Sequence, residues 1–166
     1  MIKIIVIVQA RMASTRLPGK VLAELAGRPV LEQMIRRVKR STTIDSIIVA
    51  TTTNEKDNPI ETLCSSLRVN VFRGSETDVL VRYLGAARDG GAHSIVRLTA
   101  DCPMVDPEVM DQIVNTYNRN DCDYVSNCNE RTFPDGLDTE IFSLEALEEA
   151  DKCAQSKFSR EHVTPY

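Results

Sequence analysis

Short apolar runs alternate along the chain with segments of helical spacing, and this alternation limits the folds that the chain can adopt. The runs Ile4–Val8, Ile47–Ala50, Val69–Phe72 and Ser94–Leu98 are predicted to be buried strands. Between them, apolar residues recur three and four positions apart, as on the inward face of a helix. Strands that alternate with helices predict an α/β fold, a mostly parallel sheet with helices on both faces.

Capping signals indicate where several of the helices begin and end. Proline is favoured in the first helical turn, Asp, Asn or Ser just before it, and glycine just after the last turn. Two further strands are predicted at Asp123–Ser126 and Leu137–Phe142. The capping signals are Asn58-Pro59 with Glu61, Gly90-Gly91, Asp106-Pro107, and Ser143.

Length and charge exclude several classes of protein. The 166 residues suffice for one core, and we expect a single domain over residues 1–166. The net charge of −4 argues against a nucleic-acid-binding surface. No apolar run approaches the roughly 20 residues that cross a bilayer, and the apolar start is too short for a signal peptide. The sequence therefore predicts a cytoplasmic protein that binds neither nucleic acid nor membrane.

The loop after the first predicted strand, Gln9–Lys20, concentrates positive charge. Its cations are Arg11, Arg16 and Lys20, and Ser14 adds a hydroxyl group. Guanidinium groups match phosphate oxygens, and parallel sheets bind ligands at the carboxyl ends of their strands. The loop is therefore predicted to bind phosphates, although a solvated basic loop would have the same composition. Neither the P-loop spacing nor the dinucleotide-binding glycine spacing is present.

The same loop also carries a family signature. The segment Ala10-Arg11-x-x-Ser14-Thr15-Arg16-Leu17-Pro18-Gly19-Lys20 resembles the signature of the cytidylyltransferase family. Within that family, the match is best to the branch similar to the spore-coat polysaccharide biosynthesis protein F. Three later stretches resemble this branch in the same order: Thr99–Pro107, Phe133–Asp138 and Arg160–Tyr166. The resemblance covers essentially the whole chain and implies a Rossmann-like nucleotidyltransferase fold of the GT-A-like kind.

The resemblance implies a magnesium-dependent enzyme that transfers CMP from CTP to an acidic or otherwise modified sugar. Pyrophosphate would be released, and the product would serve surface or spore-coat polysaccharide synthesis. CTP, the sugar and Mg²⁺ are thus the expected ligands. The resemblance places Arg11, Arg16 and Lys20 at the phosphates as catalytic residues, with Ala10 and Ser14 beside the nucleotide.

Three aspartates are assigned to the metal or the sugar. Asp101 directly follows the fourth predicted strand and matches the family's metal-binding aspartate, although aspartate is also common in turns. Asp135 and Asp138 are assigned to the sugar, and Asp138 also to the metal, with a polar strand end as the alternative. Strand alternation would place Asp138 and Glu140 on one face and Thr139 on the other.

Polar residues after the second and third predicted strands complete the expected nucleotide site. The segment after the third strand resembles the Ser-Gly-Thr-Asp-Arg segment near the nucleotide in the enzymes that activate sugar acids. Glu76 here replaces the glycine and Val79 the arginine, and Arg82 is a candidate to replace that arginine. The alternatives are a β-rich strand end and a helix cap. The residues assigned to the nucleotide are Thr51, Thr52, Gly74, Ser75, Thr77 and Asp78.

Two other functions remain open. A nucleotide-sugar-dependent glycosyltransferase would use a D-x-D motif, but Asp121-Cys122-Asp123 precedes a strand instead of following one. The second alternative function is that of a non-catalytic nucleotide-binding module. Because the resemblance runs to the last residue, we expect the chain to lack the family's C-terminal segment and to bind CTP with weak or absent turnover. An edge left uncovered in this way would favour a homodimer.

Overall fold

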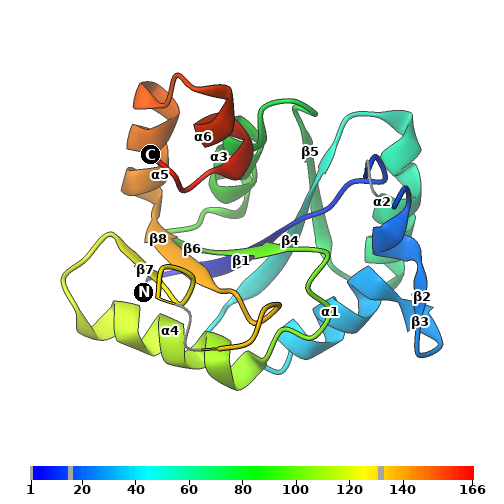
Figure 1. Cartoon of the computed structure of the whole chain (residues 1–166), viewed down its shortest axis with the longest axis horizontal. Helices are drawn as coiled ribbons and strands as arrows, with labels where there is room; N and C mark the ends of the chain where they lie inside the picture. Colours follow the sequence, from blue (N-terminus) through cyan, green and yellow to red (C-terminus); the bar gives the residue numbers. More distant parts are fainter. Residues whose placement is uncertain (1, 15–16, 131–132) are drawn as a thin grey trace.

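A six-stranded sheet runs through the middle of the molecule in the order β5-β4-β1-β6-β8-β7 (Figure 1). The computed structural model describes residues 2–14, 17–130 and 133–166. β1, β4, β5 and β6 are parallel, whereas β8 is antiparallel to both β6 and β7, so the predicted mostly parallel sheet is confirmed. The strands are β1 Ile4–Gln9, β4 Ser46–Thr52, β5 Asn70–Gly74, β6 Ser94–Thr99, β7 Tyr124–Ser126 and β8 Glu140–Ser143.

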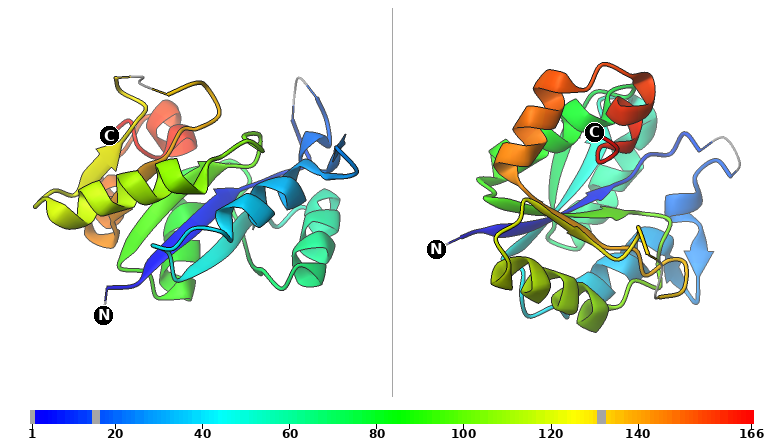
Figure 2. Two further views of the ribbon diagram at one scale, coloured as in Figure 1. Left: turned by 90° about the horizontal axis from the view of Figure 1, so that it is seen from below. Right: turned by 60° about the vertical axis from the view of Figure 1, so that its left-hand side comes forward.

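Helices cover both faces of the sheet, as the sequence predicted (Figure 2). Successive side chains of a strand point to opposite faces, so β1 sends Ile4, Val6 and Val8 into one core and Ile5 and Ile7 into another. α1, α2 and α4 cover the first core, and α3 and α5 cover the second, with α6 beside α3. The helices are α1 Val30–Val38, α2 Asn58–Ser66, α3 Val79–Gly90, α4 Pro107–Arg119, α5 Leu144–Cys153 and α6 Lys157–His162.

Most of the predicted helix ends are confirmed. The Asp106 carboxylate accepts hydrogen bonds from the amides of Glu108 and Val109 at the start of α4, and the Ser143 hydroxyl caps α5. Gly91 ends α3 in the left-handed conformation, with a φ of 64°. α2 differs from the prediction, because Asn58 is its first residue and not its cap.

The last predicted strand begins later than expected. β8 starts at Glu140 instead of Leu137, so Asp138 lies in the preceding loop. The predicted strand alternation across Asp138, Thr139 and Glu140 does not apply, because only Glu140 of the three belongs to the strand. Short elements without apolar periodicity were not predicted: the 3₁₀ turns η1 Lys20–Leu22 and η2 Glu55–Asp57, the hairpin of β2 Glu24–Leu25 and β3 Arg28–Pro29, and α6.

α3 lies very close to the sheet at two glycines. A Cβ atom on Gly85 would lie 2.4 Å from Cζ of Phe72. One on Gly90 would lie 2.7 Å from the Cδ1 atoms of both Ile5 and Ile48. These distances are shorter than van der Waals contact. The close approach of α3 to the sheet therefore depends on having glycine, without a Cβ atom, at both positions. No helix among the described residues is long and apolar enough to cross a membrane.

Candidate active site

The order of the strands reverses between β1 and β6. The chain runs from β1 outward through β4 to β5, and then returns to place β6 on the other side of β1. Ligands of open α/β sheets bind outside the carboxyl ends of the strands at such a point. A cavity of about 250 Å³ lies there, between the ends of β1 and β6, the start of α3 and the end of α6.

The cavity brings together a large part of the predicted site. Ala10, Arg11, Ser14, Lys20 and Asp101 all line it, although they come from two separate segments of the chain. Arg16, which was predicted to bind phosphate, lies outside the described residues.

Lys20 and Asp101 form an ion pair across the cavity. Gly19 has a φ of 73°, a conformation that glycine adopts readily, and its amide donates to the carbonyl oxygen of Met12 at 2.9 Å. This turn directs Lys20 inward, and its Nζ atom lies 2.7 Å from Oδ2 of Asp101. Burial pushes the pKa of Asp101 upward, but hydrogen bonds from Lys20 and Thr99 outweigh it and keep the pKa below its ordinary value. The carboxylate is therefore ionised and accessible, with 42% of the side chain exposed.

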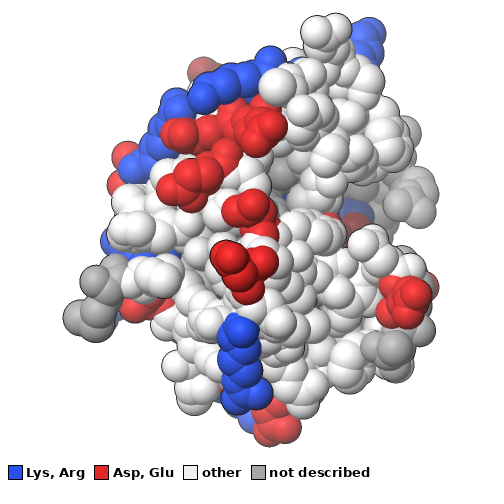
Figure 3. Space-filling model, turned by 90° about the vertical axis from the view of Figure 1, so that its left-hand side faces the viewer, with Lys and Arg blue, Asp and Glu red and all other residues white. Residues whose placement is uncertain are grey.

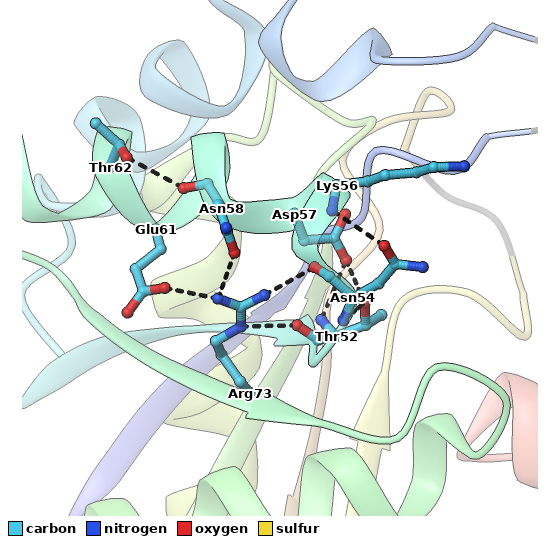
Figure 4. Close-up of polar contacts among 8 residues, drawn as sticks. All are labelled: Thr52, Asn54, Lys56, Asp57, Asn58, Glu61, Thr62 and Arg73. Carbon is cyan, nitrogen blue, oxygen red and sulfur yellow. Dashed lines mark hydrogen bonds and ion pairs between the residues drawn. The ribbon is translucent and has the colours of Figure 1, made fainter.

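A buried carboxylate holds the base of the loop that bears Arg11. Asp57 is 2% exposed and accepts a hydrogen bond of 2.7 Å from the amide of Met12. Its other oxygen accepts from the amide and the hydroxyl group of Thr52 (Figure 4). Arg73 supports the same region by donating to the carbonyl oxygens of Thr52 and Asn54. Contacts between distant segments thus fix the position at which the loop leaves the sheet.

The structure does not bring Thr51 and Thr52 to the cavity. Their side chains are 0% and 1% exposed, and the hydroxyl group of Thr52 is bonded to Asp57. Neither threonine lines the cavity. Their position agrees with the alternative interpretation, a strand end rich in β-branched residues.

The segment Gly74–Asp78 borders the site through the helix that it starts. The Asp78 carboxylate caps α3 by accepting from the amide of Val81 at 3.0 Å, and the amide of Asp78 donates to the hydroxyl group of Ser75. Gly74, Ser75, Thr77 and Asp78 do not themselves line the cavity. Arg82, one turn further along α3, does.

Among the described residues that line the cavity, two have a buried polar atom without a hydrogen-bond partner. These atoms are Nε of Arg82 and Oε1 of Gln9. Buried polar atoms are normally paired, because leaving one unpaired costs about 1–3 kcal/mol. Because both atoms are enclosed, a ligand in the cavity could supply the missing partners only if the two side chains shift when it binds.

α6 forms the remaining wall of the cavity, with Glu161 and His162. Arg160 holds this helix in place, because its Nε atom lies 2.5 Å from Oδ2 of Asp78 and its Nη2 atom 2.6 Å from Oδ1 of Asp151. The sequence prediction gave Glu161 and His162 no function. The available signal was their place in the stretch Arg160–Tyr166, which resembled the family.

A strained turn follows α6 directly. Val163 has a φ of 71° and a ψ of −54°, and the amide of Thr164 donates to the carbonyl oxygen of His162 at 2.9 Å. This is a γ-turn, which is rare and strained for a β-branched residue. Such a conformation persists only where the surroundings fix it. Val163 is buried, and the hydroxyl group of Thr164 donates to Glu140 at 2.7 Å.

Comparison with known proteins identifies the family. The model of the family described as "Cytidylyltransferase" matches residues 5–166. The chain belongs to the cytidylyltransferase family. The resemblance read from the loop Ala10–Lys20 is thereby confirmed.

Individual relatives agree with this assignment. An uncharacterized protein of Methanocaldococcus jannaschii is 49% identical over 99% of this chain and 66% of its own length. The spore coat polysaccharide biosynthesis protein SpsF of Bacillus subtilis is 36% identical over 98% of this chain and 69% of its own. The chain thus spans about two thirds of each. A solved cytidylyltransferase structure from Leptospira borgpetersenii superposes with a TM-score of 0.95 at 39% identity, covering 100% of this chain and 71% of that one.

The other two predicted aspartates, Asp135 and Asp138, do not line the cavity between β1 and β6. Burial raises the pKa of the Cys102 thiol, and the charges of Asp101 and Asp138 raise it further. Asp135 is exposed in the loop that precedes β8. Among residues 2–14, 17–130 and 133–166, no three His, Cys, Asp or Glu side chains are grouped as a metal site.

A second cavity of about 550 Å³ lies between α5, β7 and the end of the chain. Asp123, Glu145 and Glu149 line it. It lies on the side of the molecule where acidic side chains gather (Figure 3). Like charges repel, so a triphosphate is disfavoured there. Asp121-Cys122-Asp123, the candidate glycosyltransferase motif, belongs to this region and is not part of the cavity between β1 and β6.

Proposed function

We propose that this chain binds CTP in the cavity between β1 and β6 and transfers CMP to a hydroxyl group of a sugar. The observation that carries the proposal is the convergence of Arg11, Lys20 and Arg82 with the carboxylate of Asp101 at the reversal point of a cytidylyltransferase sheet. Cations suit the triphosphate, and an accessible carboxylate suits a divalent ion bound to it.

The reaction asks little covalent chemistry of the protein. The sugar oxygen forms a bond to the α-phosphorus of CTP, the bond from that phosphorus to pyrophosphate breaks, and the hydroxyl proton is released. The protein positions the two reactants and neutralises the charge that builds on the phosphate oxygens. We assign this role to Arg11 and Lys20, and their place in the lining of the cavity beside the end of β1 supports the assignment.

Mg²⁺ fits the residues that are present. Mg²⁺ is commonly held by one or two carboxylates together with substrate phosphates and water. Asp101 is ionised and lies at the cavity wall, so we propose that it holds the ion, with Asp138 as the nearby second carboxylate. The ion would neutralise charge on the phosphates. When CTP enters, Lys20 would exchange Asp101 for phosphate oxygens.

The biological setting is proposed by analogy with the Bacillus subtilis relative. Its name points to a polysaccharide of the spore coat, and we propose synthesis of a surface polysaccharide from a CMP-activated sugar. An acidic or otherwise modified sugar is the expected acceptor. The cytoplasmic location and the homodimer stay predictions.

A nucleotide survey tests the proposed function. The chain is titrated with CTP, UTP, ATP and GTP in the presence of magnesium, and pyrophosphate release is followed with a panel of sugars. We expect CTP to bind most tightly and to be the best donor. Tighter binding of ATP or GTP than of CTP would contradict the assignment of the donor.

Replacing Lys20 by alanine tests the phosphate contact. Loss of a charge-assisted hydrogen bond is expected to weaken CTP binding by about 1.5–3 kcal/mol, roughly 10- to 150-fold. The free energy of unfolding should change by less than about 1 kcal/mol, because the pair with Asp101 is partly exposed. Lys56→Ala removes an exposed lysine outside the cavity and serves as the control. Equal CTP affinities for the two variants would refute the contact.

A further inference from the structure

Arg82 is a buried cation that no carboxylate neutralises. The side chain is 2% exposed. Nη1 donates to the carbonyl oxygen of Ser75, while Nε has no partner. Among the described residues, no Asp or Glu forms an ion pair with it. A guanidinium group in this position has lost water without gaining a counter-ion, which is a costly arrangement.

The nearest negative charges are committed elsewhere. Asp57 and Asp78 are close enough to influence Arg82 electrostatically. Asp57 is bonded to Met12 and Thr52, however, and Asp78 caps α3 and pairs with Arg160. Neither can turn to Arg82 without giving up contacts that organise the cavity.

Three partly buried arginines in the described part of the chain have a carboxylate partner, whereas the partly buried Arg37 donates to the carbonyl oxygen of Val105. Arg97 pairs with Glu140, Arg73 with Glu61, and Arg160 with Asp78 and Asp151. Arg82 differs from them in a second respect as well, since it lines the cavity. Burial lowers its pKa, and the positive charge of Arg11, which lines the same cavity, lowers it further.

We propose that Arg82 pairs with an oxyanion of the bound ligand, a phosphoryl group or a carboxylate, and that Arg11 approaches the same group from the loop. The inference rests on the proposed function and adds an anion-binding residue from α3 to it. The carbonyl oxygen of Ser75 does not explain the arginine, because a neutral donor would satisfy it as well. The charge is explained only by a negative partner.

The test compares two arginines of one helix. Arg82→Gln and Arg88→Gln remove the same charge from α3, but Arg88 is exposed and pairs with Glu148 outside the cavity. Affinities for CTP, inorganic pyrophosphate, cytidine and the sugar acid 3-deoxy-manno-octulosonate are measured by calorimetry at two salt concentrations. Thermal melting shows whether each variant is folded.

The four probes distinguish the source of the oxyanion. If it is a phosphate, Arg82→Gln should weaken binding of CTP and pyrophosphate by about tenfold or more and leave cytidine binding unchanged. If it is a carboxylate, only binding of the sugar acid should weaken by that factor. Arg88→Gln should stay within about twofold for every probe. Parent-like affinities of Arg82→Gln for all four probes would overturn the proposal.

If Arg82→Gln does not fold, two further measurements test whether Arg82 pairs with an oxyanion of the ligand. Arg82→Lys retains the charge and should retain more than half of the salt dependence of binding. In the unmodified chain, the proton on Nε of Arg82 should shift in NMR spectra on addition of pyrophosphate or the sugar acid, because the buried N–H gains a partner. No shift at saturation would overturn the proposal. If the unmodified chain binds no CTP at all, the proposed function fails instead.

Discussion

Replacing Glu140 by alanine is expected to lower the free energy of unfolding by about 3–5 kcal/mol. Glu140 is buried on β8 and pairs with Arg97 of β6. It also accepts from the hydroxyl groups of Tyr124 at 2.8 Å and Thr164 at 2.7 Å. Its removal leaves Arg97 charged and unpaired in the interior, and it removes the side-chain hydrogen bonds that link β8 to Tyr124 and Thr164.

Urea denaturation followed by circular dichroism measures this effect. Glu148→Ala is the matched control, because Glu148 pairs with the exposed Arg88 and its loss should cost less than about 1 kcal/mol. Glu140→Gln should fall between the two variants, since an amide oxygen still accepts from Tyr124 and Thr164. A loss below about 1 kcal/mol in Glu140→Ala would show that the buried pair contributes little.

Asp101→Asn is expected to abolish the dependence of CTP binding on magnesium. Loss of the carboxylate should reduce the metal-dependent gain in CTP affinity by about 10- to 100-fold. In metal-free buffer the variant should bind CTP at least as tightly as the parent chain, because Lys20 loses the carboxylate that now occupies it. Where turnover is measurable, pyrophosphate release should fall by about 100-fold, roughly 2.7 kcal/mol in the barrier.

Titration of CTP with and without magnesium separates these effects. Stability should change little, because the Lys20–Asp101 pair is partly exposed. The matched control is Asp106→Asn, since asparagine caps a helix nearly as well as aspartate and Asp106 is not part of the cavity. If Asp101→Asn responds to magnesium like the parent chain, Asp101 is a turn residue and the ion is held elsewhere.

The architecture could be predicted from the sequence because it depends on local patterns. Buried strands such as Ile4–Val8 and caps such as Asp106 and Ser143 are properties of short segments. The rule for parallel sheets then led to the ends of β1 and β6, where Arg11, Lys20 and Asp101 do lie. These inferences needed no knowledge of contacts between distant residues.

What the sequence could not indicate depends on such contacts. Thr52 looked available after its strand, but Asp57 takes its hydroxyl group and also binds Met12, which lies far away in the sequence. That no described carboxylate forms an ion pair with Arg82 becomes clear only when the positions of the surrounding carboxylates, such as Asp57 and Asp78, are known. α6 is too short to show a periodic apolar face, and Arg160 anchors it through Asp78 and Asp151.

The absence of a side chain at Gly85 lets α3 approach the sheet closely, and this approach influences the shape of the cavity. Gly85 lies one turn after Arg82, and its contact with Phe72 leaves no room for a methyl group. A larger residue there would displace either the Phe72 ring or α3, and a shift of α3 would carry Arg82 with it. The position of Arg82 therefore depends on a residue that does not line the cavity. A substitution at Gly85 can thus alter the shape of the cavity while every charged residue that lines it stays unchanged.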